Sequence, residues 1–113
     1  MKDGQGYIDE YGDRVWVVDG KYHREDGPAV ELKDGDKVWY LNGKRHREDG
    51  PAVEWGDGNK AWYRHGLIHR EDGPAIETED FDEEWYYYGW EAENEKEFYD
   101  PTWRREIELK VLL

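Results

Sequence analysis

The chain has 113 residues, 36% hydrophobic and 40% charged, so it has room for one domain but not for a large aliphatic core. The absence of cysteine excludes disulfides, and the net charge of −13 disfavours direct binding to nucleic acid and favours basic partners. Seven Trp and nine Tyr nevertheless argue against disorder and predict a thin folded domain with an aromatic spine.

A repeat organises the chain. The string HREDGPA occurs at His23–Ala29, His46–Ala52 and His69–Ala75, at intervals of 23 residues. Tryptophans 16, 39, 62 and 85 and glycines 20, 43, 66 and 89 lie on the same period. Asp3-Gly4 falls one period before Asp26-Gly27, which predicts a degenerate unit at the start. A fixed period of this size is typical of one supersecondary unit stacked on copies of itself.

Each repeat is predicted to form two short antiparallel strands with two turns. In the middle repeat, the apolar runs 51–55 and 60–63 flank Asp57-Gly58-Asn59, which has turn chemistry. Asn42-Gly43 between two further runs is a strong hairpin signal, because both residues tolerate positive φ. We therefore expect a mainly β fold in which hairpins over residues 1–90 form a twisted meander or a curved, partly open barrel.

The pattern changes after the third copy of the string. Phe81 replaces the turn glycine, and Ala92 stands where a fourth His would be. Glutamates 93, 95 and 97 with Phe98 predict a first short helix. Asp100 is a candidate N-cap for a second helix over 101–112, whose apolar residues recur at helical spacing. Residues 91–113 are therefore expected to cap the open end of a single domain.

The His-Arg-Glu-Asp part of the string predicts a turn network, in which His caps a backbone carbonyl, Arg pairs with Glu, and Asp fixes the Gly-Pro turn. A metal shared between repeats is disfavoured, because residues two strand spacings apart lie about 9–10 Å from each other. A ligand site within one repeat and catalysis are the alternatives, but the chain has no Ser or Cys for His to activate. The tryptophan ladder is expected to pack in the core rather than to form a stacking platform. The residues assigned to this framework are His23, Asp26, Gly27, His46, Asp49, Gly50, His69, Asp72, Gly73, Trp39, Trp62 and Trp85.

Most of the negative charge lies in one stretch. Residues 1–76 contain 16 acids and 12 bases, whereas residues 77–100 contain 11 acids and one base, Lys96. Acids around exposed aromatics favour a binding hot spot, and the alternative is a solvated edge that blocks end-to-end association. A calcium site is less favoured, because Asp80 and Asp82 lack the full ligand spacing. The residues expected to bind a partner are Glu79, Asp80, Asp82, Glu83, Glu84, Tyr87, Trp90, Glu91, Glu93, Glu95 and Glu97.

The unit W-Y-x-N-G-K-x-H-R-E-D-G-P-A-V, seen best at 39–53, resembles a variant of the MORN repeat family found in small bacterial and tailed-phage proteins. The resemblance covers roughly residues 7–90. It implies a β-hairpin array without catalytic residues or cofactors. Some bacterial proteins with such repeats are regarded as antitoxins, and others as scaffolding or membrane-associated modules.

These observations predict a non-enzymatic acidic module that inhibits a basic, nucleic-acid-handling protein, as an antitoxin, a phage anti-defence or anti-CRISPR-like inhibitor, or a DNA mimic. The first alternative is a structural module that self-assembles, and a weaker one is a carbohydrate-active enzyme with paired carboxylates. No cofactor, metal or membrane partner is expected. No stretch approaches the length of a membrane span, so we expect a cytoplasmic protein, located in the host cytoplasm if phage-encoded.

Overall fold

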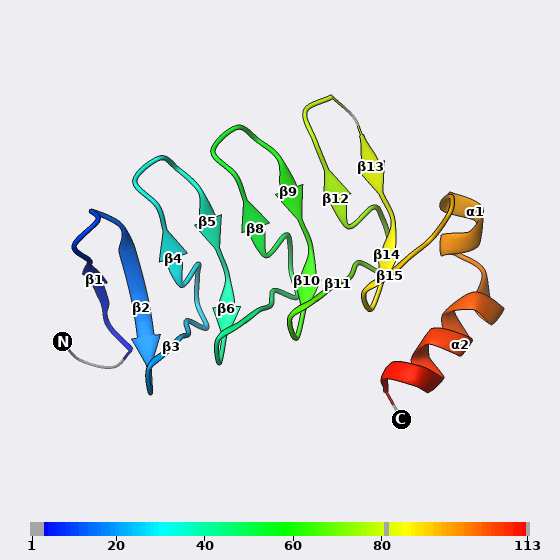
Figure 1. Ribbon diagram of the computed structural model, residues 1–113, viewed down its shortest axis with the longest axis horizontal. Helices are drawn as coiled ribbons and strands as arrows, with labels where there is room; N and C mark the ends of the chain where they lie inside the picture. The colour runs from blue at the N-terminus through cyan, green and yellow to red at the C-terminus, as the bar shows by residue number, and fades with distance from the viewer. Residues whose placement is uncertain (1–3, 81, 113) are drawn as a thin grey trace.

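The repeats form an extended row of hairpins, one layer thick, in the computed structural model, which describes residues 4–80 and 82–112 (Figure 1). The molecule measures 48 × 36 × 18 Å. Upper hairpins join into one antiparallel sheet in the order β1-β2-β4-β5-β8-β9-β12-β13. Its strands are β1 (Gly6–Ile8), β2 (Arg14–Val18), β4 (Val30–Glu31), β5 (Lys37–Val38), β8 (Val53–Glu54), β9 (Lys60–Ala61), β12 (Ile76–Glu77) and β13 (Glu83–Glu84). The sheet is an open meander that does not close on itself, so the predicted hairpin meander is confirmed.

A second row of smaller hairpins lies below this sheet in Figure 1. Its strands are β3 (Lys21–Tyr22), which pairs with the end of β2, β6 (Tyr40–Leu41) with β7 (Lys44–Arg45), β10 (Tyr63–Arg64) with β11 (Leu67–Ile68), and β14 (Tyr86–Tyr87) with β15 (Trp90–Glu91). The predicted Asn-Gly turn lies between β6 and β7, where Asn42 and Gly43 both have positive φ. Each repeat therefore supplies one upper and one lower hairpin.

The degenerate unit at the start is also visible. The β1–β2 turn repeats the bonds of the β4–β5 turn one period earlier, because Asp9 N–H donates to the Asp13 carbonyl as Leu32 N–H donates to that of Asp36. Gly12 and Gly35 both adopt positive φ at the same place in these turns. Two residues used to define the repeat pattern lie outside the described residues: Asp3, assigned to the degenerate first unit, and Phe81, which replaces the turn glycine.

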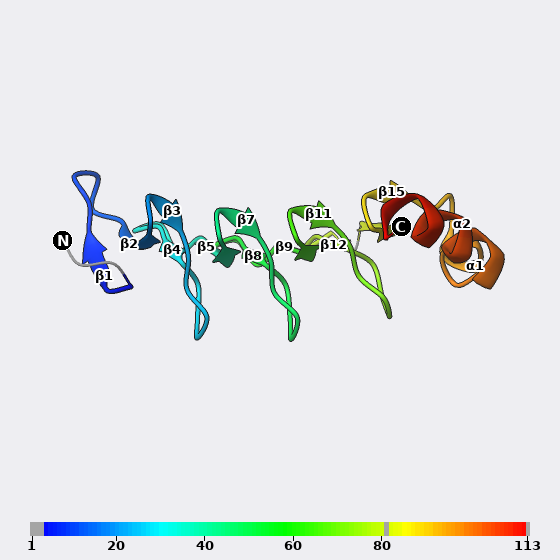
Figure 2. The ribbon, with the colours of Figure 1, turned by 90° about the horizontal axis from the view of Figure 1, so that it is seen from below.

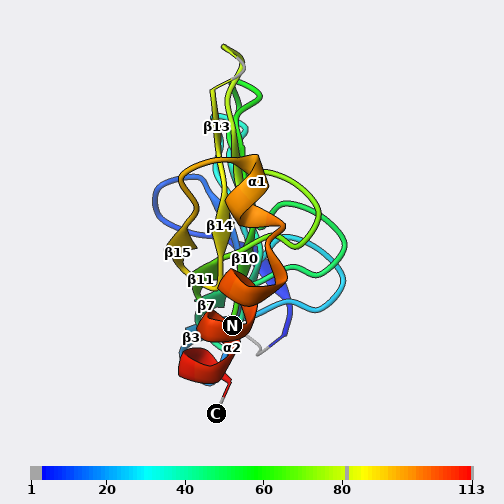
Figure 3. The same cartoon turned by 90° about the vertical axis from the view of Figure 1, so that its right-hand side faces the viewer.

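Three loops that carry the HREDGPA string project from one face of the sheet (Figures 2 and 3). Each loop ends on a fully buried alanine: Ala29, Ala52 and Ala75 are all 0% exposed. The carbonyl of each alanine accepts the N–H of the tryptophan that begins the preceding lower hairpin, as in the 2.8 Å bond from Trp62 to Ala75. The string is thus the link through which each repeat bonds to the one before it.

Two C-terminal helices follow the repeats, as predicted, but they cover the lower part of the last repeat and not the upper strand edge that the cap was expected to protect (Figure 1). They are α1 (Glu95–Phe98) and α2 (Pro101–Val111), and Asp100 caps α2 by accepting the N–H groups of Thr102 and Trp103. Phe98 and Ile107 are 0% and 3% exposed and pack with Tyr87 and Ala92. This cluster contains the most voluminous fully buried side chain of the described residues, Phe98, whereas the array buries mainly alanine and valine.

Candidate functional site

The arginine of each HREDGPA string is held between an indole ring and a glycine. The Arg47 guanidinium lies 3.9 Å from the ring centroid of Trp39, and a Cβ on Gly50 would meet its Cζ at 2.9 Å. Arg24 over Trp16 and Arg70 over Trp62 repeat this arrangement at 3.8 and 3.9 Å. A side chain at these glycines would have to displace the guanidinium from its ring. The tryptophans are covered by cations rather than by apolar side chains.

Carboxylates complete the network around each arginine. Arg47 donates from Nε to Asp49 at 2.9 Å, and from Nη1 to the Pro51 carbonyl at 3.1 Å and to Glu54 at 3.2 Å. This differs from the predicted network in two ways: the arginine reaches a glutamate seven residues ahead, and the aspartate binds the arginine rather than fixing the turn. The hydrogen bond from Arg47 and its charge lower the pKa of Asp49.

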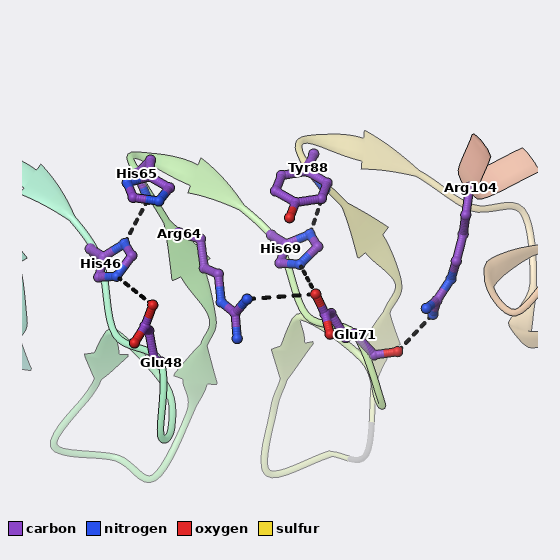
Figure 4. Close-up of polar contacts among 8 residues, drawn as sticks. All are labelled: His46, Glu48, Arg64, His65, His69, Glu71, Tyr88 and Arg104. Carbon is purple, nitrogen blue, oxygen red and sulfur yellow. Dashed lines mark hydrogen bonds and ion pairs between the residues drawn. The ribbon is translucent and has the colours of Figure 1, made fainter. Parts of the chain in front are cut away.

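The histidines accept a backbone N–H, so the prediction that they cap a carbonyl is wrong. The Nδ1 atom of His69 accepts the N–H of Tyr88 at 2.7 Å, and that of His46 accepts the N–H of His65 at 2.9 Å (Figure 4). His23 accepts in the same way from Asn42 at 3.0 Å. An imidazole that accepts at Nδ1 is neutral and carries its proton on Nε2.

These bonds hold residues with an uncommon backbone conformation. Asn42, His65 and Tyr88 all have φ between 46° and 51°, a region that bulky L-residues avoid. Each occupies the first position of a lower-hairpin turn in the next repeat, and the histidine binds its N–H group. The histidines therefore join successive repeats at the strained turn.

His69 is buried deepest of the three, with a side-chain exposure of 0%. Burial, assisted by the positive charge of Arg64, lowers its pKa to about 4, although Glu71 at 3.7 Å acts in the opposite direction. Its Nε2 has no hydrogen-bond partner among the described residues. Burial also lowers the pKa of His46, again with neighbouring positive groups. The fold thus keeps these imidazoles neutral.

Two grooves separate successive loops, with volumes of 620 and 470 Å³. The first is lined by Trp39, Leu41 and His46 between two HREDGPA loops, and the second by Trp62, Arg64 and His69 at the equivalent place. Beside the third HREDGPA loop, α2 contributes Arg104. Its guanidinium donates to the Glu71 carbonyl at 2.7 Å and lies 4.6 Å from the ring centroids of Tyr87 and Phe98. In the described part of the chain, no three His, Cys, Asp or Glu side chains gather as a metal site would need.

The acids predicted to bind a partner lie around the closing end of the row, which faces the viewer in Figure 3. Glu79 and Asp80 lie at the β12–β13 turn, and Asp82, Glu83 and Glu84 continue along the last strand of the sheet. Glu91 ends β15, while Glu93, Glu95 and Glu97 lie on or beside α1. The Tyr86 side chain connects the two groups: its hydroxyl is 3.5 Å from Glu84, and burial together with Glu91 and Glu84 raises its pKa.

Two aromatic residues of the predicted contact surface behave differently. Tyr87 is only 6% exposed and packs under α2, so its assignment to the contact surface is wrong. The alternation of residues along β14 could not predict that Tyr87 is buried, because the helix that covers it comes from a later segment of the chain. Trp90 is 47% exposed, with Lys110 of α2 4.8 Å from its ring.

Among the acids of the predicted contact surface, Glu97 is half-buried and accepts the N–H of Glu93 at 3.1 Å, which makes it a local cap.

Sequence reasoning overlooked two features, one at the closing end and one along the array. Arg104 was not singled out, although it lies on a helical face beside an aromatic-rich repeat that lacks its own arginine, since Glu93 stands at the position of Arg70. The ion pairing of glutamates 31, 54 and 77 was also missed, and their position one period apart was the available signal.

No family model, curated protein or solved structure matches the chain. The resemblance to the MORN family therefore stays a prediction. Among the described residues, no helix is long and apolar enough to cross a membrane.

Proposed function

We propose that the chain is a protein-binding module whose acidic closing end occupies a basic surface on a nucleic-acid-handling partner. The contrast between paired and unpaired acids supports this most directly. Every acid of the HREDGPA strings lies 2.9 to 3.8 Å from an Arg or His nitrogen. None of the acids from Glu79 to Glu84 forms an ion pair with another residue in 4–80 and 82–112.

Unpaired carboxylates on a rigid frame have a strong field and little conformational freedom to lose on binding. Glu79, Asp80, Glu83 and Glu84 are all exposed, and the backbone of Glu83 and Glu84 is held by pairing with Glu77 and Ile76. A surface of this kind attracts basic partners quickly and loses affinity at high salt. Occupation of a Lys- and Arg-lined groove would block nucleic acid, as expected for an antitoxin or an anti-defence inhibitor, including an anti-CRISPR-like or DNA-mimicking one.

Charge reversal tests this proposal. The variant with Glu79, Asp80, Glu83 and Glu84 all changed to Lys should no longer retain basic proteins from a lysate of the host cell. Proteins retained by the unmodified chain should be released by salt and by duplex DNA or RNA. The matched control changes four exposed acids that form no ion pair with the described residues, Glu10, Asp34, Asp57 and Glu106, to Lys, which alters net charge equally. Equal retention by both variants would contradict the proposal.

Self-assembly is the second candidate, and the opposite edge of the sheet favours it. No strand among the described residues pairs with the outer side of β1, where Ile8 is 56% exposed and the neighbouring Tyr11 is 68% exposed. An exposed apolar strand edge is a site of association between copies. Sedimentation velocity over a wide concentration range separates the two candidates, because a strict monomer rules out self-assembly.

A further inference from the structure

Charges alternate from strand to strand across one row of the upper sheet. Residues paired directly with one another in this row are, in order, Arg14, Glu31, Lys37, Glu54, Lys60, Glu77 and Glu83. Each acid up to Glu54 therefore has a base on both sides, which stabilises the pairing. The alternation fails at the last step, where Glu77 faces Glu83 instead of a base.

The neighbouring row changes at the same strand. It runs through Tyr7, Val15, Val30, Val38, Val53, Ala61, Ile76 and Glu84. All its members but the last are apolar or aromatic. β13 thus presents two adjacent acids, one in each row, and both are exposed.

The outer side of β13 also has a backbone N–H group that is not bonded within 4–80 and 82–112. In each preceding repeat a tryptophan N–H bonds to the next repeat, as Trp39 does to Ala52 at 2.7 Å and Trp62 to Ala75 at 2.8 Å. The N–H of Trp85 has no acceptor among the described residues. Tyr99 and Asp100 stand where the next strand would come, one period after Ile76 and Glu77, but they lead into α2. Figure 1 shows the helices beside the lower hairpin rather than beside β13.

We propose that the outer edge of β13 receives an extended strand of the partner, which carries two adjacent basic residues opposite Glu83 and Glu84. The strand takes the place that a further repeat would occupy. Its backbone bonds to Glu83 and Trp85, which are two residues apart and so face the same edge, and its cations restore the alternation that ends at Glu77. This inference rests on the proposed function in that the partner is basic, and adds how it is held.

A second copy of the chain does not fit this edge in a head-to-tail stack. The free strand β1 of that second copy carries Tyr7 in the apolar row and Ile8 in the charged row. Stacking would place these side chains opposite Glu84 and Glu83 and leave both carboxylates unpaired and partly desolvated. Charge complementarity therefore selects a basic strand over the chain's own edge.

A peptide based on a strand of the array provides the probe. The segment 50–55 contains the strand that pairs with β5, with Glu54 opposite Lys37 and Val53 opposite Val38. We would use this hexapeptide with both Val53 and Glu54 replaced by lysine and with blocked ends. Its titration into the full-length protein should shift the backbone amide resonances of Glu83 and Trp85 and slow their hydrogen exchange. The same peptide with both positions replaced by glutamate should have no effect.

Two further comparisons separate strand pairing from simple charge attraction. E83P and E83Q both remove the charge, but only proline also removes the outward N–H. Loss of one cross-strand charge pair, as in E83Q, should weaken binding no more than about fivefold, whereas E83P should abolish it. N-methylation of the peptide at the residue that replaces Glu54 should abolish binding too, without any change to the protein's own folding.

The results distinguish the two proposals. Equal binding by E83P and E83Q, no effect of N-methylation, or no change at the Glu83 and Trp85 amides would overturn strand docking. The proposed function would survive these results if reversal of the four acids still abolished retention of basic proteins. An edge that serves only to prevent association would not bind the lysine peptide at all, and this outcome would also overturn strand docking.

Discussion

In the array, each arginine of the HREDGPA loops has a fixed carboxylate partner, whereas at the closing end the acids of β13 and its turn form no ion pair with the described residues. Arg47 alone contacts Asp49, Glu54, the Pro51 carbonyl and the ring of Trp39. Stability in the array therefore depends on polar contacts repeated from unit to unit. The closing end depends on a small apolar cluster under two helices, and the acids of β13 and its turn form no ion pair that would hold the fold there.

The largest expected effect comes from truncation in that apolar cluster. Phe98 stands one period after Ala75, so F98A restores the residue that the array has at this position. Because Phe98 is 0% exposed and packs against Trp85, Tyr99 and the Arg104 side chain, the change should cost about 3–5 kcal/mol of unfolding free energy. Denaturant titration measures this loss directly.

A truncation in the array sets the scale for that result. V53A removes two methyl groups from a residue that is 2% exposed and should cost about 2 kcal/mol. Hydrogen exchange at the amides of α2 should be faster in F98A and unchanged in V53A, since repeats contact mainly their neighbours. An equal loss in both variants would mean that the cap is not the main apolar core.

Acidification should weaken the contacts between repeats. The pKa of His69 is lowered to about 4 in the folded chain from an ordinary value of 6.5, so the unfolded chain binds more protons between these values. The stability that depends on neutral His69 is complete above pH 6.5 and is lost as the pH falls toward 4, by up to about 3 kcal/mol. Unfolding free energies measured every half pH unit should show this slope.

H69Q supplies the control for this pH dependence. A glutamine carbonyl can accept the Tyr88 N–H that His69 now accepts, but it does not titrate. The slope between pH 6.5 and 4 should therefore shrink to what His46 contributes. Asp26 and Asp49 have pKa values lowered by Arg24 and Arg47, so their stabilisation is lost only below about 3.8. An unchanged slope in H69Q would show that His69 is not the group responsible.

Local sequence patterns predicted the hairpins and the cap well, because the physical causes are local. Asn42-Gly43 needs positive φ at both positions, and Asp100-Pro101 supplies an N-cap and a first helical residue, whatever the rest of the chain does. The tripled string likewise fixed the period, and with it the order of strands in the meander.

Contacts between repeats could not be obtained in the same way. The histidines bind an N–H group 19 residues ahead, and nothing in the string itself shows whether a ring nitrogen donates or accepts. Tyr87 alternates like an exposed strand residue, but a helix that begins at Pro101 covers it. Exposure could therefore be predicted for strongly charged residues such as Glu83 and Glu84, but not for Tyr87, whose burial depends on a later segment that folds back.

A moderate effect should follow from changing the chemistry of one loop while keeping its charge. R47K keeps the cation but loses the flat guanidinium that stacks on Trp39 and bonds to Asp49 and Glu54. The expected loss is about 1–2 kcal/mol in denaturant titration. R105K on exposed α2, which changes Arg to Lys where no ion pair is formed with the described residues, should be nearly neutral, and an equal loss there would contradict the stacking argument.

The smallest expected effect is on folding stability, which should fall when Glu54 is neutralised and rise when Glu83 is neutralised. E54Q removes a partner of Arg47 that also lies between Lys37 and Lys60, so it should destabilise the chain by about 0.5 kcal/mol. E83Q relieves the like-charge pair with Glu77 and should stabilise by a few tenths of a kcal/mol. Added salt screens both interactions, so the two melting curves should converge as its concentration rises. If E83Q instead destabilised the chain, Glu83 would belong to the array's charge network, and the sheet edge would already be satisfied without a partner.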